Sequence, residues 1–391
     1  MRTKVRAPRA VPLDGAQRNN LTTPLYLTTM KVSLLVASNK YTGAAAAAEH
    51  CCRALMAAGV DSQLVFTGGN NLERRLRGFD WARPTLRKER GLGDLGHNLE
   101  VIREAAAAAD LLICHLPHDH ALAVHAKAYR TTPIVRNFRN SGHVRRDPYH
   151  RHLNRRLTAA LAANSALEAA LRSTLRREVP VGNFPVPLEE RFRPGRDPLR
   201  WRERLGIPGE APVAGMIGKV ARGRGFDLFL QAAARLDEST HLIVIGHGEA
   251  QPELEALATR LGLTKRLHWT GYQDRELPAI YAAMNVVLFP AAGSDHGHRA
   301  ISEAQGCGRP VVAADLPGVR DLVEDGVTGR VVPATSESMG EAMANLLDRP
   351  SDADAMGSAA AAATEARRFP MVGRALSNFL EEVLRQTSST R

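Results

Sequence analysis

The strongest constraint on the fold is a regular alternation of short apolar segments with helix-forming segments, and it occurs twice along the chain. In the first half, apolar runs at 30–38, 62–67, 111–115 and 133–137 alternate with helical patterns, beginning with the alanine-rich segment 43–59. Strands joined by crossover helices pair in parallel, and the helices cover both faces of the resulting sheet. The pattern therefore predicts a doubly wound α/β domain.

A polar, proline-bearing stretch at 184–198 interrupts this rhythm, and the alternation restarts with the apolar run 213–217. A chain of 391 residues also exceeds what one hydrophobic core usually serves. We therefore expect two Rossmann-like domains that face a central cleft, with ligands held at the carboxyl ends of the strands. The predicted segments are a disordered basic tail (1–29), a first domain (30–195), a second domain (196–365) and a C-terminal helix (366–391).

The composition indicates a basic protein with an acidic partner. A net charge of +11 and a pI near 9.9 fit nucleotide phosphates, an anionic membrane surface or nucleic acid, and charge alone does not choose among them. No apolar segment reaches the roughly 20 residues that span a bilayer. We therefore expect a cytoplasmic protein, with the inner face of the membrane as a further hypothesis. The four cysteines lack metal-ligand spacing, which favours buried free thiols.

The loop that follows the first strand of the second domain combines glycines with cations. Its glycines allow a ligand to approach the backbone, its cations can donate to phosphate oxygens, and the helix that follows adds a positive N-terminus. The loop therefore predicts a diphosphate site, with a solvated basic turn as the less favoured alternative. The residues concerned are Gly218, Lys219, Arg222, Gly223, Arg224 and Gly225.

Two later strands of the second domain also end in glycine turns, Gly246-His-Gly248 and Gly271-Tyr272. Strands that end on the same edge of a sheet meet in one crevice. A nucleotide base could rest there against Tyr272, although turn formation alone would also explain the glycines.

The stretch 294–315 places two acids eight residues apart, Asp295 in a loop and Glu303 inside a helix predicted to begin near Arg299. Both carboxylates can face the same cleft. Asp295 could instead be a loop or near-cap carboxylate, and Glu303 could lie on a solvated helix face. The tight turn into a buried strand shortly after Glu303 disfavours simple exposure.

Taken in order, these motifs resemble the C-terminal domain of glycosyltransferase family 4. The series runs from Gly218-Lys219 and Arg224-Gly225, through Gly246-His-Gly248, to Asp295-x7-Glu303, Cys307-Gly-Arg-Pro310 and Asp325-Gly-Val-Thr-Gly329. The resemblance covers Met30 to about Gln386. It implies the GT-B fold and a retaining, metal-independent enzyme that uses a nucleotide diphosphate sugar.

The resemblance also assigns roles residue by residue. Lys219 and Arg224 correspond to the cations that bind the diphosphate, while Asp295 and Glu303 correspond to the acids that hold the sugar hydroxyls and the ribose diol. The first domain becomes the acceptor domain, the second the donor domain, and the C-terminal helix crosses back onto the first. Further donor contacts are expected from Gly43, Gly218, Gly246, Tyr272, Gly297, His298 and Arg299.

One family feature is altered in this sequence. The family often carries a histidine near the reacting sugar carbon, shortly after the strand that corresponds to 133–137, and simple alignment places Arg139 there. His143 lies four residues later and would fit only if the loop is rebuilt. We predict that Arg139 contacts a phosphate or the acceptor.

Seven arginines crowd into 136–156. This basic segment could be a solvated helix face, a dock for an anionic acceptor or a contact with an anionic membrane, and no nucleic-acid-binding motif accompanies it. The pair Asp352 and Asp354 spells a DxD string, but we expect a helix cap in a polar loop there.

The resemblance as a whole implies transfer of a hexosyl or related sugar, with retention and without metal or cofactor, to a hydroxyl acceptor. The acceptor would be a glycan or a lipid-linked molecule of cell-envelope or polysaccharide biosynthesis. The alternatives are a catalytically idle protein of the same fold that binds a nucleotide sugar, and a basic module that binds membranes or nucleic acid.

Overall fold

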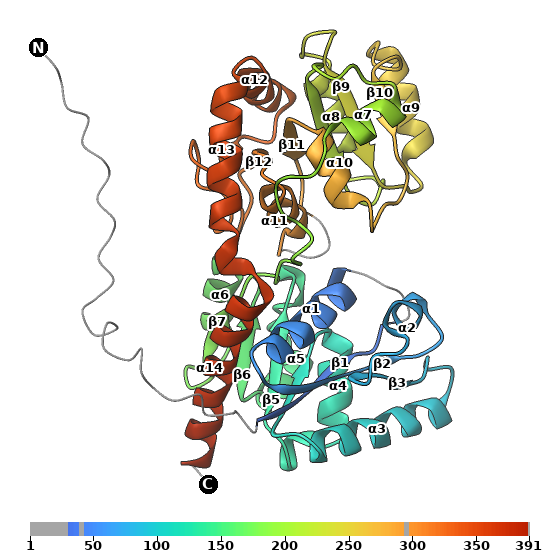
Figure 1. Cartoon of the computed structure of the whole chain (residues 1–391). Helices are drawn as coiled ribbons and strands as arrows, with labels where there is room; N and C mark the ends of the chain where they lie inside the picture. The colour runs from blue at the N-terminus through green and yellow to red at the C-terminus, as the bar shows by residue number, and fades with distance from the viewer. Residues whose placement is uncertain (1–29, 39–42, 293–296, 390–391) are drawn as a thin grey trace, which may run out of the picture.

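The computed structural model describes residues 30–38, 43–292 and 297–389, which form two α/β domains placed one above the other (Figure 1). Each domain is built on a parallel sheet with helices on its faces. The first sheet has seven strands: β1 (Lys31–Val36), β2 (Asp61–Thr67), β3 (Ala82–Leu86), β4 (Leu111–Cys114), β5 (Ile134–Phe138), β6 (Ala159–Ala162) and β7 (Val181–Asn183).

The first sheet has the order β3-β2-β1-β4-β5-β6-β7, so the direction in which strands are added reverses between β1 and β4. Its central strands β1, β4 and β5 are almost entirely buried, as parallel strands covered by helices on both faces must be, and β5 differs from the mainly apolar β1 and β4 in carrying Arg136 and Asn137. The helices and turns of this domain are α1 (Gly43–Ala57), α2 (Asn71–Leu76), α3 (Leu92–Ala107), α4 (Pro117–His125), η2 (Ala128–Arg130), η3 (Ser141–His143), α5 (Pro148–Asn154) and α6 (Ser165–Arg172).

The second sheet repeats this plan with the order β10-β9-β8-β11-β12-β13, and its reversal lies between β8 and β11. Its strands are β8 (Val213–Ile217), β9 (His241–Ile245), β10 (Leu267–Trp269), β11 (Val286–Phe289), β12 (Val311–Ala314) and β13 (Gly329–Val332). The remaining elements are α7 (Leu199–Leu205), α8 (Phe226–Ala233), α9 (Gln251–Arg260), α10 (Leu277–Ala283), α11 (Arg299–Gly306), α12 (Ser336–Leu347), α13 (Pro350–Ala363), η4 (Glu365–Arg367) and α14 (Phe369–Ser388).

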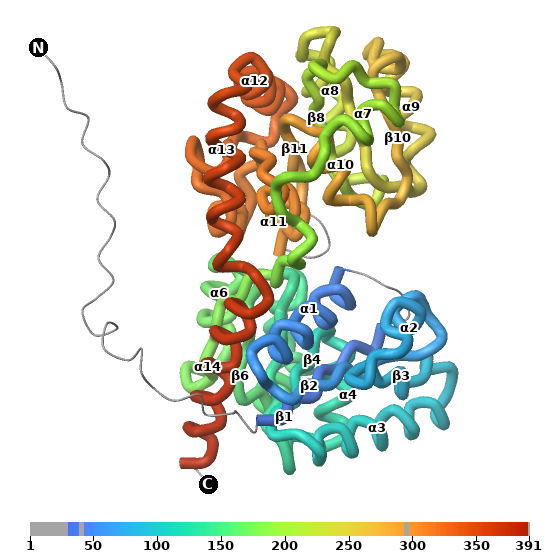
Figure 2. The backbone as a smooth tube through the Cα atoms, viewed as in Figure 1, coloured from blue at the N-terminus to red at the C-terminus, as the bar shows by residue number. Residues whose placement is uncertain are grey.

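The chain passes between the domains twice, between β7 and α7 and again at the start of α14 (Figure 2). Helix α14 packs against α1 of the first domain, and its apolar face, with Leu376, Leu380 and Val383, joins that domain's core. A Cβ at Gly373 would lie 1.8 Å from the carbonyl oxygen of Ala54, so glycine permits the close approach of the two helices.

Several local features differ from the sequence-based expectations. The acids Asp352 and Asp354 lie inside α13 rather than in a loop, because Pro350 occupies the first turn and starts that helix. Some elements are not indicated by apolar periodicity in the sequence, because most of them are short and partly exposed. They are helices α2, α5 and α7 and strands β3 and β7.

Candidate functional site

The loop predicted to bind a diphosphate connects β8 to α8 at the carboxyl edge of the second sheet. Gly225 caps α8 with φ 78°, and Gly223 has φ 72°, a region that favours glycine. A Cβ at Gly225 would lie 2.6 Å from Cγ of Pro290, in the segment that follows β11. The loop therefore lies against the chain that leads toward α11, at the reversal point of the second sheet.

The cations of this loop lie at the surface. Lys219 Nζ lies 3.2 Å from a carboxylate oxygen of Glu249, and both side chains are 64% exposed. Arg222 pairs with Glu253 in the same way, whereas Arg224 is half-buried. Exposed ion pairs contribute little to stability, so a phosphate ligand can replace the glutamate as the partner of Lys219.

The glycines after β9 have a packing role. A Cβ at Gly246 would lie 1.9 Å from the carbonyl oxygen of Gly218, and one at Gly248 would lie 2.2 Å from that of Val220. These glycines hold the two loops together, so they contribute to the site through its backbone shape. Beyond them, Tyr272 is 64% exposed, and its ring lies edge-on to His247 at 6.2 Å.

Glu303 is buried in α11, which begins at Arg299 as the sequence predicts. One carboxylate oxygen pairs with Arg299 Nε at 3.1 Å, and the other accepts a hydrogen bond from the Tyr281 hydroxyl at 3.3 Å. Burial raises the pKa of Glu303, and Arg299 opposes that rise. A solvated helix face is therefore the wrong interpretation of this residue.

The residues that precede α11 form a constrained turn. His298, its N-cap, adopts a left-handed conformation with φ 46°. Its Nε2 lies 2.9 Å from the carbonyl oxygen of Pro317, and its ring packs against Phe289. Gly297 is buried beside it. The predicted sugar-binding acid, Asp295, lies outside the described residues.

Arg139 extends from the end of β5 in the first domain to this turn of the second domain. It is 4% exposed, and a Cβ at Gly297 would lie 2.0 Å from its Nη2 atom. The position that simple alignment gives to the family histidine is thus occupied by a guanidinium beside Gly297. His143 lies in η3, partly exposed, and Gly43 is the first residue of α1.

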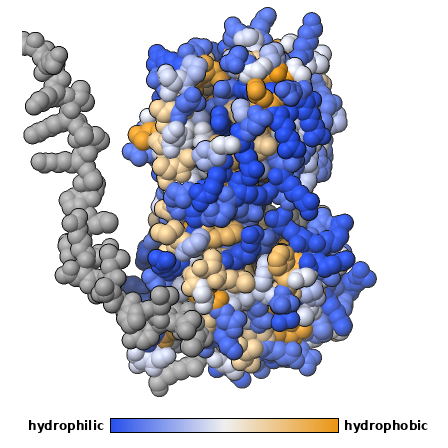
Figure 3. Space-filling model, viewed as in Figure 1, coloured by the Kyte–Doolittle hydropathy of each residue, from blue (hydrophilic) through white to orange (hydrophobic). Residues whose placement is uncertain are grey.

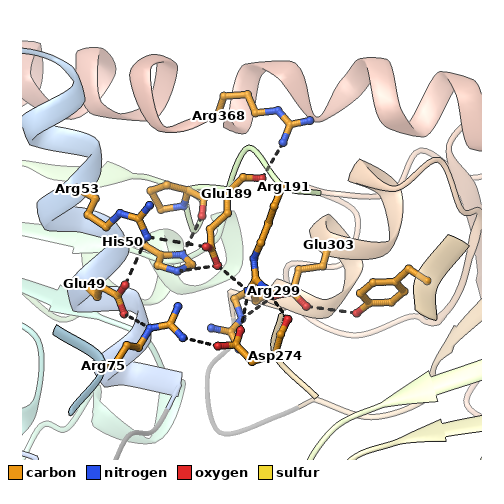
Figure 4. Close-up of polar contacts among 12 residues, drawn as sticks. Glu49, His50, Arg53, Arg75, Glu189, Arg191, Asp274, Arg299, Glu303 and Arg368 are labelled. Carbon is orange, nitrogen blue, oxygen red and sulfur yellow. Dashed lines mark hydrogen bonds and ion pairs between the residues drawn. The ribbon is translucent and has the colours of Figure 1, made fainter. Parts of the chain in front are cut away.

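A network of charged residues that the sequence analysis missed joins the two domains (Figure 4). Asp274, after β10, lies 2.7 Å from Arg75 of α2 and 2.8 Å from Arg191 of the β7–α7 connection. Arg191 also lies 3.1 Å from Glu189, which His50 of α1 approaches to 3.6 Å. In Figure 4 this network lies beside Arg299 and Glu303.

The electrostatics of the network favour the charged forms of its acids. Burial alone would raise the pKa of Glu189, but hydrogen bonding and charge from His50 and Arg191 hold it well below its ordinary value. Asp274 behaves similarly: burial raises its pKa, and Arg191 and Arg75 together lower it. A second bridge between the domains is the hydrogen bond from Ser165 to Asp321, at 2.6 Å.

A surface pocket of about 420 Å³ lies near this network in the first domain. It is lined by Glu49, Arg53, Met56, Arg75, Leu76, Phe79, Trp81 and Phe369. Figure 3 shows apolar side chains gathered over this part of the first domain, amid a largely hydrophilic surface. None of the predicted site residues lines this pocket, so it is separate from the predicted donor site.

Two features are absent from the described residues. None of the helices there is both long enough and apolar enough to cross a membrane. Within the same ranges, no group of three or more His, Cys, Asp or Glu side chains is arranged to hold a metal ion.

Comparison with known families gives matches to the second domain. The family model described as "Glycosyl transferases group 1" matches residues 198–363. This domain is similar to those of glycosyltransferases. An alpha-D-kanosaminyltransferase from Streptomyces kanamyceticus is 34% identical over 154 residues, which make up 38% of this chain and 39% of that protein. A D-inositol 3-phosphate glycosyltransferase from Xylanimonas cellulosilytica is 40% identical over 136 residues, 34% of this chain and 32% of that protein. The matches thus span about two fifths or less of these curated relatives.

Solved structures extend the similarity in fold over both domains. Anabaena HepE in complex with UDP and glucose superposes with a TM-score of 0.76 at 20% identity, covering 90% of this chain and 100% of that one. Sucrose-phosphate synthase from Thermosynechococcus elongatus gives a TM-score of 0.74 at 18% identity, with coverage of 91% and 100%. The predicted GT-B fold, two Rossmann-like domains with parallel sheets, is therefore confirmed.

Proposed function

We propose that the protein is a retaining glycosyltransferase that moves a hexosyl or related sugar from a nucleotide diphosphate sugar to a hydroxyl acceptor. The observation that carries the proposal is the glycosyltransferase match of 198–363 together with the placement of its predicted donor residues. The Lys219 loop follows β8 and the Glu303 helix follows β11, and these neighbouring strands flank the reversal point of the sheet. Ligands of doubly wound sheets bind at that point.

In this proposal Lys219 and Arg224 neutralise the charge that develops on the leaving diphosphate, which lowers the barrier electrostatically and requires no metal. Lys219 would exchange its exposed partner Glu249 for a phosphate oxygen. The α11 N-terminus and the backbone at Gly297 would add amide donors toward the same group. Tyr272, exposed at the end of β10, would contact the base.

Glu303 would accept hydrogen bonds from the ribose diol. Its two oxygens already face Arg299 and the Tyr281 hydroxyl, which hold the carboxylate in a fixed orientation. A buried carboxylate with an arginine partner suits a diol, because charge-assisted hydrogen bonds are stronger than neutral ones. Asp295 would hold the sugar hydroxyls, as the sequence resemblance implies.

The reaction we propose takes place on one face of the sugar, with a diphosphate oxygen accepting the proton of the attacking hydroxyl. Arg139, beside Gly297, would contact the phosphate or sugar from the first domain. Closure of the two domains would exclude water from the activated donor. The bridge from Arg75 to Asp274 supports this closed arrangement.

For the acceptor we propose a glycan or lipid-linked hydroxyl compound of cell-envelope or polysaccharide biosynthesis, reached at the inner face of the membrane. The basic segment 136–156 supports contact with an anionic surface. Arg145, Arg146, Arg151, Arg155 and Arg156 are all exposed there, and Tyr149 is 50% exposed. Each such charge near an anionic membrane contributes about 1 kcal/mol.

A donor panel tests the proposal. Thermal shift and transfer assays would use UDP-, GDP- and ADP-sugars, with UDP-glucose first because HepE is described in complex with UDP and glucose. We expect one donor class to raise the melting temperature of the native chain and to lose this effect in the Lys219→Ala, Arg224→Ala double variant. Arg222→Ala is the matched control, since it removes a cation of the same loop that the family resemblance does not assign to the diphosphate. Binding without turnover would favour the idle alternative, and binding that survives the double variant would refute the donor assignment.

A further inference from the structure

The first domain holds a cluster of buried polar side chains that the donor proposal does not use. We name it the β4–β5 cluster, and it comprises His115, His120, Arg136 and Asn137. Each of these side chains is at most 7% exposed. Within the described residues, five of their buried nitrogen and oxygen atoms have no hydrogen-bond partner: His115 Nε2, His120 Nδ1, His120 Nε2, Arg136 Nη2 and Asn137 Oδ1. Buried polar atoms are nearly always paired in native proteins, so this concentration requires an explanation.

The cluster lies where a doubly wound sheet binds its ligand. His115 follows β4 directly, and its backbone N–H bonds Leu35 of β1. Asp119 ties the two strands together, because its carboxylate accepts hydrogen bonds from the N–H groups of Ala37, His115 and Leu116. The reversal point of the first sheet is thus fixed by Asp119, and the β4–β5 cluster lies beside it.

Arg136 is the unusual member of the cluster. It is 1% exposed, and its guanidinium carbon lies 4.0 Å from the centre of the Phe138 ring, two residues along β5. The side chain therefore runs toward the carboxyl edge of the sheet. Burial lowers the pKa of Arg136 to about 10, and Cys114 and Asp119 partly offset this. A buried charge without a bonded counter-ion is costly, and an anionic ligand would remove that cost.

The histidines of the cluster supply neutral donors and acceptors. Burial lowers the pKa values of His115 and His120 to about 3, with Arg139 and Arg136 respectively adding to the effect. A neutral imidazole offers one N–H donor and one acceptor nitrogen. His115 Nδ1 lies 3.4 Å from the Asn137 amide, while its Nε2 is left for another partner.

We propose that the β4–β5 cluster is the acceptor subsite and that it binds an oxyanion, a phosphate or carboxylate group carried by the acceptor. Arg136 supplies the charge, and His115, His120 and Asn137 supply directional hydrogen bonds. The inference rests on the proposed function, which places the donor beside Gly297. Arg139, one residue beyond β5, extends from this edge of the first sheet to Gly297. An acceptor anchored at the cluster would present its hydroxyl toward the donor sugar.

Thermal shift with small anions on the full chain tests this subsite. Sodium phosphate and sodium acetate would be titrated at constant ionic strength, with chloride as the balancing salt. At about ten times the dissociation constant, phosphate or acetate should raise the melting temperature of the native chain by about 3 °C. The rise should persist in Lys219→Ala, Arg224→Ala, which removes the donor cations, and should disappear in Arg136→Met. The larger of the two shifts identifies the anion.

The variants also separate a ligand site from a structural cluster. If Arg136 belongs to a ligand site, its charge is uncompensated in the unliganded protein. The Arg136→Met variant should then melt at or above the temperature of the native chain, because it removes that buried charge and keeps a side chain of similar volume. Asn137→Asp should likewise suppress the anion shift, since it places a carboxylate inside the cluster. A lower melting temperature for Arg136→Met together with an anion shift retained in Asn137→Asp would overturn the proposal.

Two further outcomes would also overturn it. One is a shift that Lys219→Ala, Arg224→Ala abolishes and Arg136→Met retains, because the anion would then bind only at the donor loop. The other is the absence of any shift with either anion in the native chain. The donor panel is independent of both outcomes, so failure of the acceptor subsite and failure of the donor proposal remain distinguishable.

Discussion

The two sheets place their polar residues at equivalent edges but in opposite environments. At the edge of the second sheet, Lys219 and Arg222 are exposed and paired with exposed glutamates. At the edge of the first, Arg136 and His120 are buried, and atoms of both side chains lack hydrogen-bond partners among the described residues. The same fold can thus offer one surface whose ion pairs exchange readily in water and another whose polar groups are desolvated in advance.

This difference lies in the side chains and not in the topology. The Lys219 loop lies at the reversal point of the second sheet, between β8 and β11, and the β4–β5 cluster lies beside that of the first sheet, between β1 and β4. The family match covers 198–363 and therefore the second edge alone. Such a difference between the edges is expected if many enzymes share the donor that binds at the second edge, while the acceptor that binds at the first differs from one enzyme to another.

The largest loss of activity should come from removing cations at the exposed edge of the second sheet. The Lys219→Ala, Arg224→Ala double variant should lower kcat/KM for the preferred donor by about 10²–10³, the loss typical when stabilisation of a developing negative charge is removed. The melting temperature should change little, because Lys219 is exposed and its ion pair is weak. Steady-state kinetics with Arg222→Ala as the control would check this. Equal losses in the double variant and in Arg222→Ala would indicate a general effect of loop charge.

Glu303 allows a finer test of the same edge, because it is the buried acid of the proposed donor site. Glu303→Gln keeps the shape but removes the charge, and the affinity for nucleotide should fall about 10- to 100-fold, the range for hydrogen bonds to charged groups. Tyr281→Phe removes only the hydroxyl that donates to Glu303 and should have a smaller effect. Calorimetry with the nucleoside diphosphate would measure both. A larger loss for Tyr281→Phe would mean that Glu303 acts through packing.

Some features of the second edge could be predicted from the sequence. The glycines and cations of 218–225 are contiguous, and the start of α11 at Arg299 follows from a local pattern. The charged network was missed because its members are far apart: Arg191 and Asp274 are separated by 83 residues, and Glu189 lies in the stretch interpreted as a domain boundary. Sequence spacing carries no signal for such contacts.

Gly246 and Arg136 show two further reasons why sequence alone falls short. Gly246 was assigned to donor binding, yet its lack of a Cβ is required by the carbonyl of Gly218, a neighbour that only the fold brings close. Arg136 was one of seven arginines in a basic segment, and its strand buries it while most of the others are exposed. Burial depends on the register of β5, which charge patterns do not reveal.

The buried edge should respond to pH in a window of its own. His115 and His120 have folded pKa values near 3, below the value of about 6.5 expected in the unfolded chain. As the pH falls below 6.5, both histidines bind protons in the unfolded chain and not in the folded one, which lowers the free energy of unfolding. Asp119 acts in the opposite direction, because burial raises its pKa to about 7 and it takes up a proton first in the folded chain. Two histidines outweigh one carboxyl, so a net decrease remains. The limiting slope is about 1.4 kcal/mol per pH unit for each histidine. Urea unfolding between pH 7.5 and 5 should show this decline, and His120→Asn should reduce it. Identical profiles for the two proteins would contradict it.

The acids of the network titrate in a different window, which keeps the two effects apart. The pKa of Glu189 is lowered in the folded protein, so the stability it contributes is present above its unfolded pKa and is lost only as the pH falls below about 4.5. Glu189→Gln should therefore leave the decline between pH 6.5 and 5 unchanged. A shallower decline in this variant would assign the effect to the network instead of the β4–β5 cluster.

The smallest effect should come from the contacts that join the two edges. Arg75 and Asp274 link α2 to the second domain at 2.7 Å, but their side chains are 25% and 35% exposed, so solvent screens much of the attraction. A double-mutant cycle with Arg75→Met and Asp274→Asn should give a coupling energy of about 0.5–1 kcal/mol, at the upper end for accessible pairs. Because the pair forms only when the domains meet, the same coupling should appear in donor KM more than in kcat. Coupling confined to stability would mean that the bridge holds the resting arrangement and takes no part in closure over the donor.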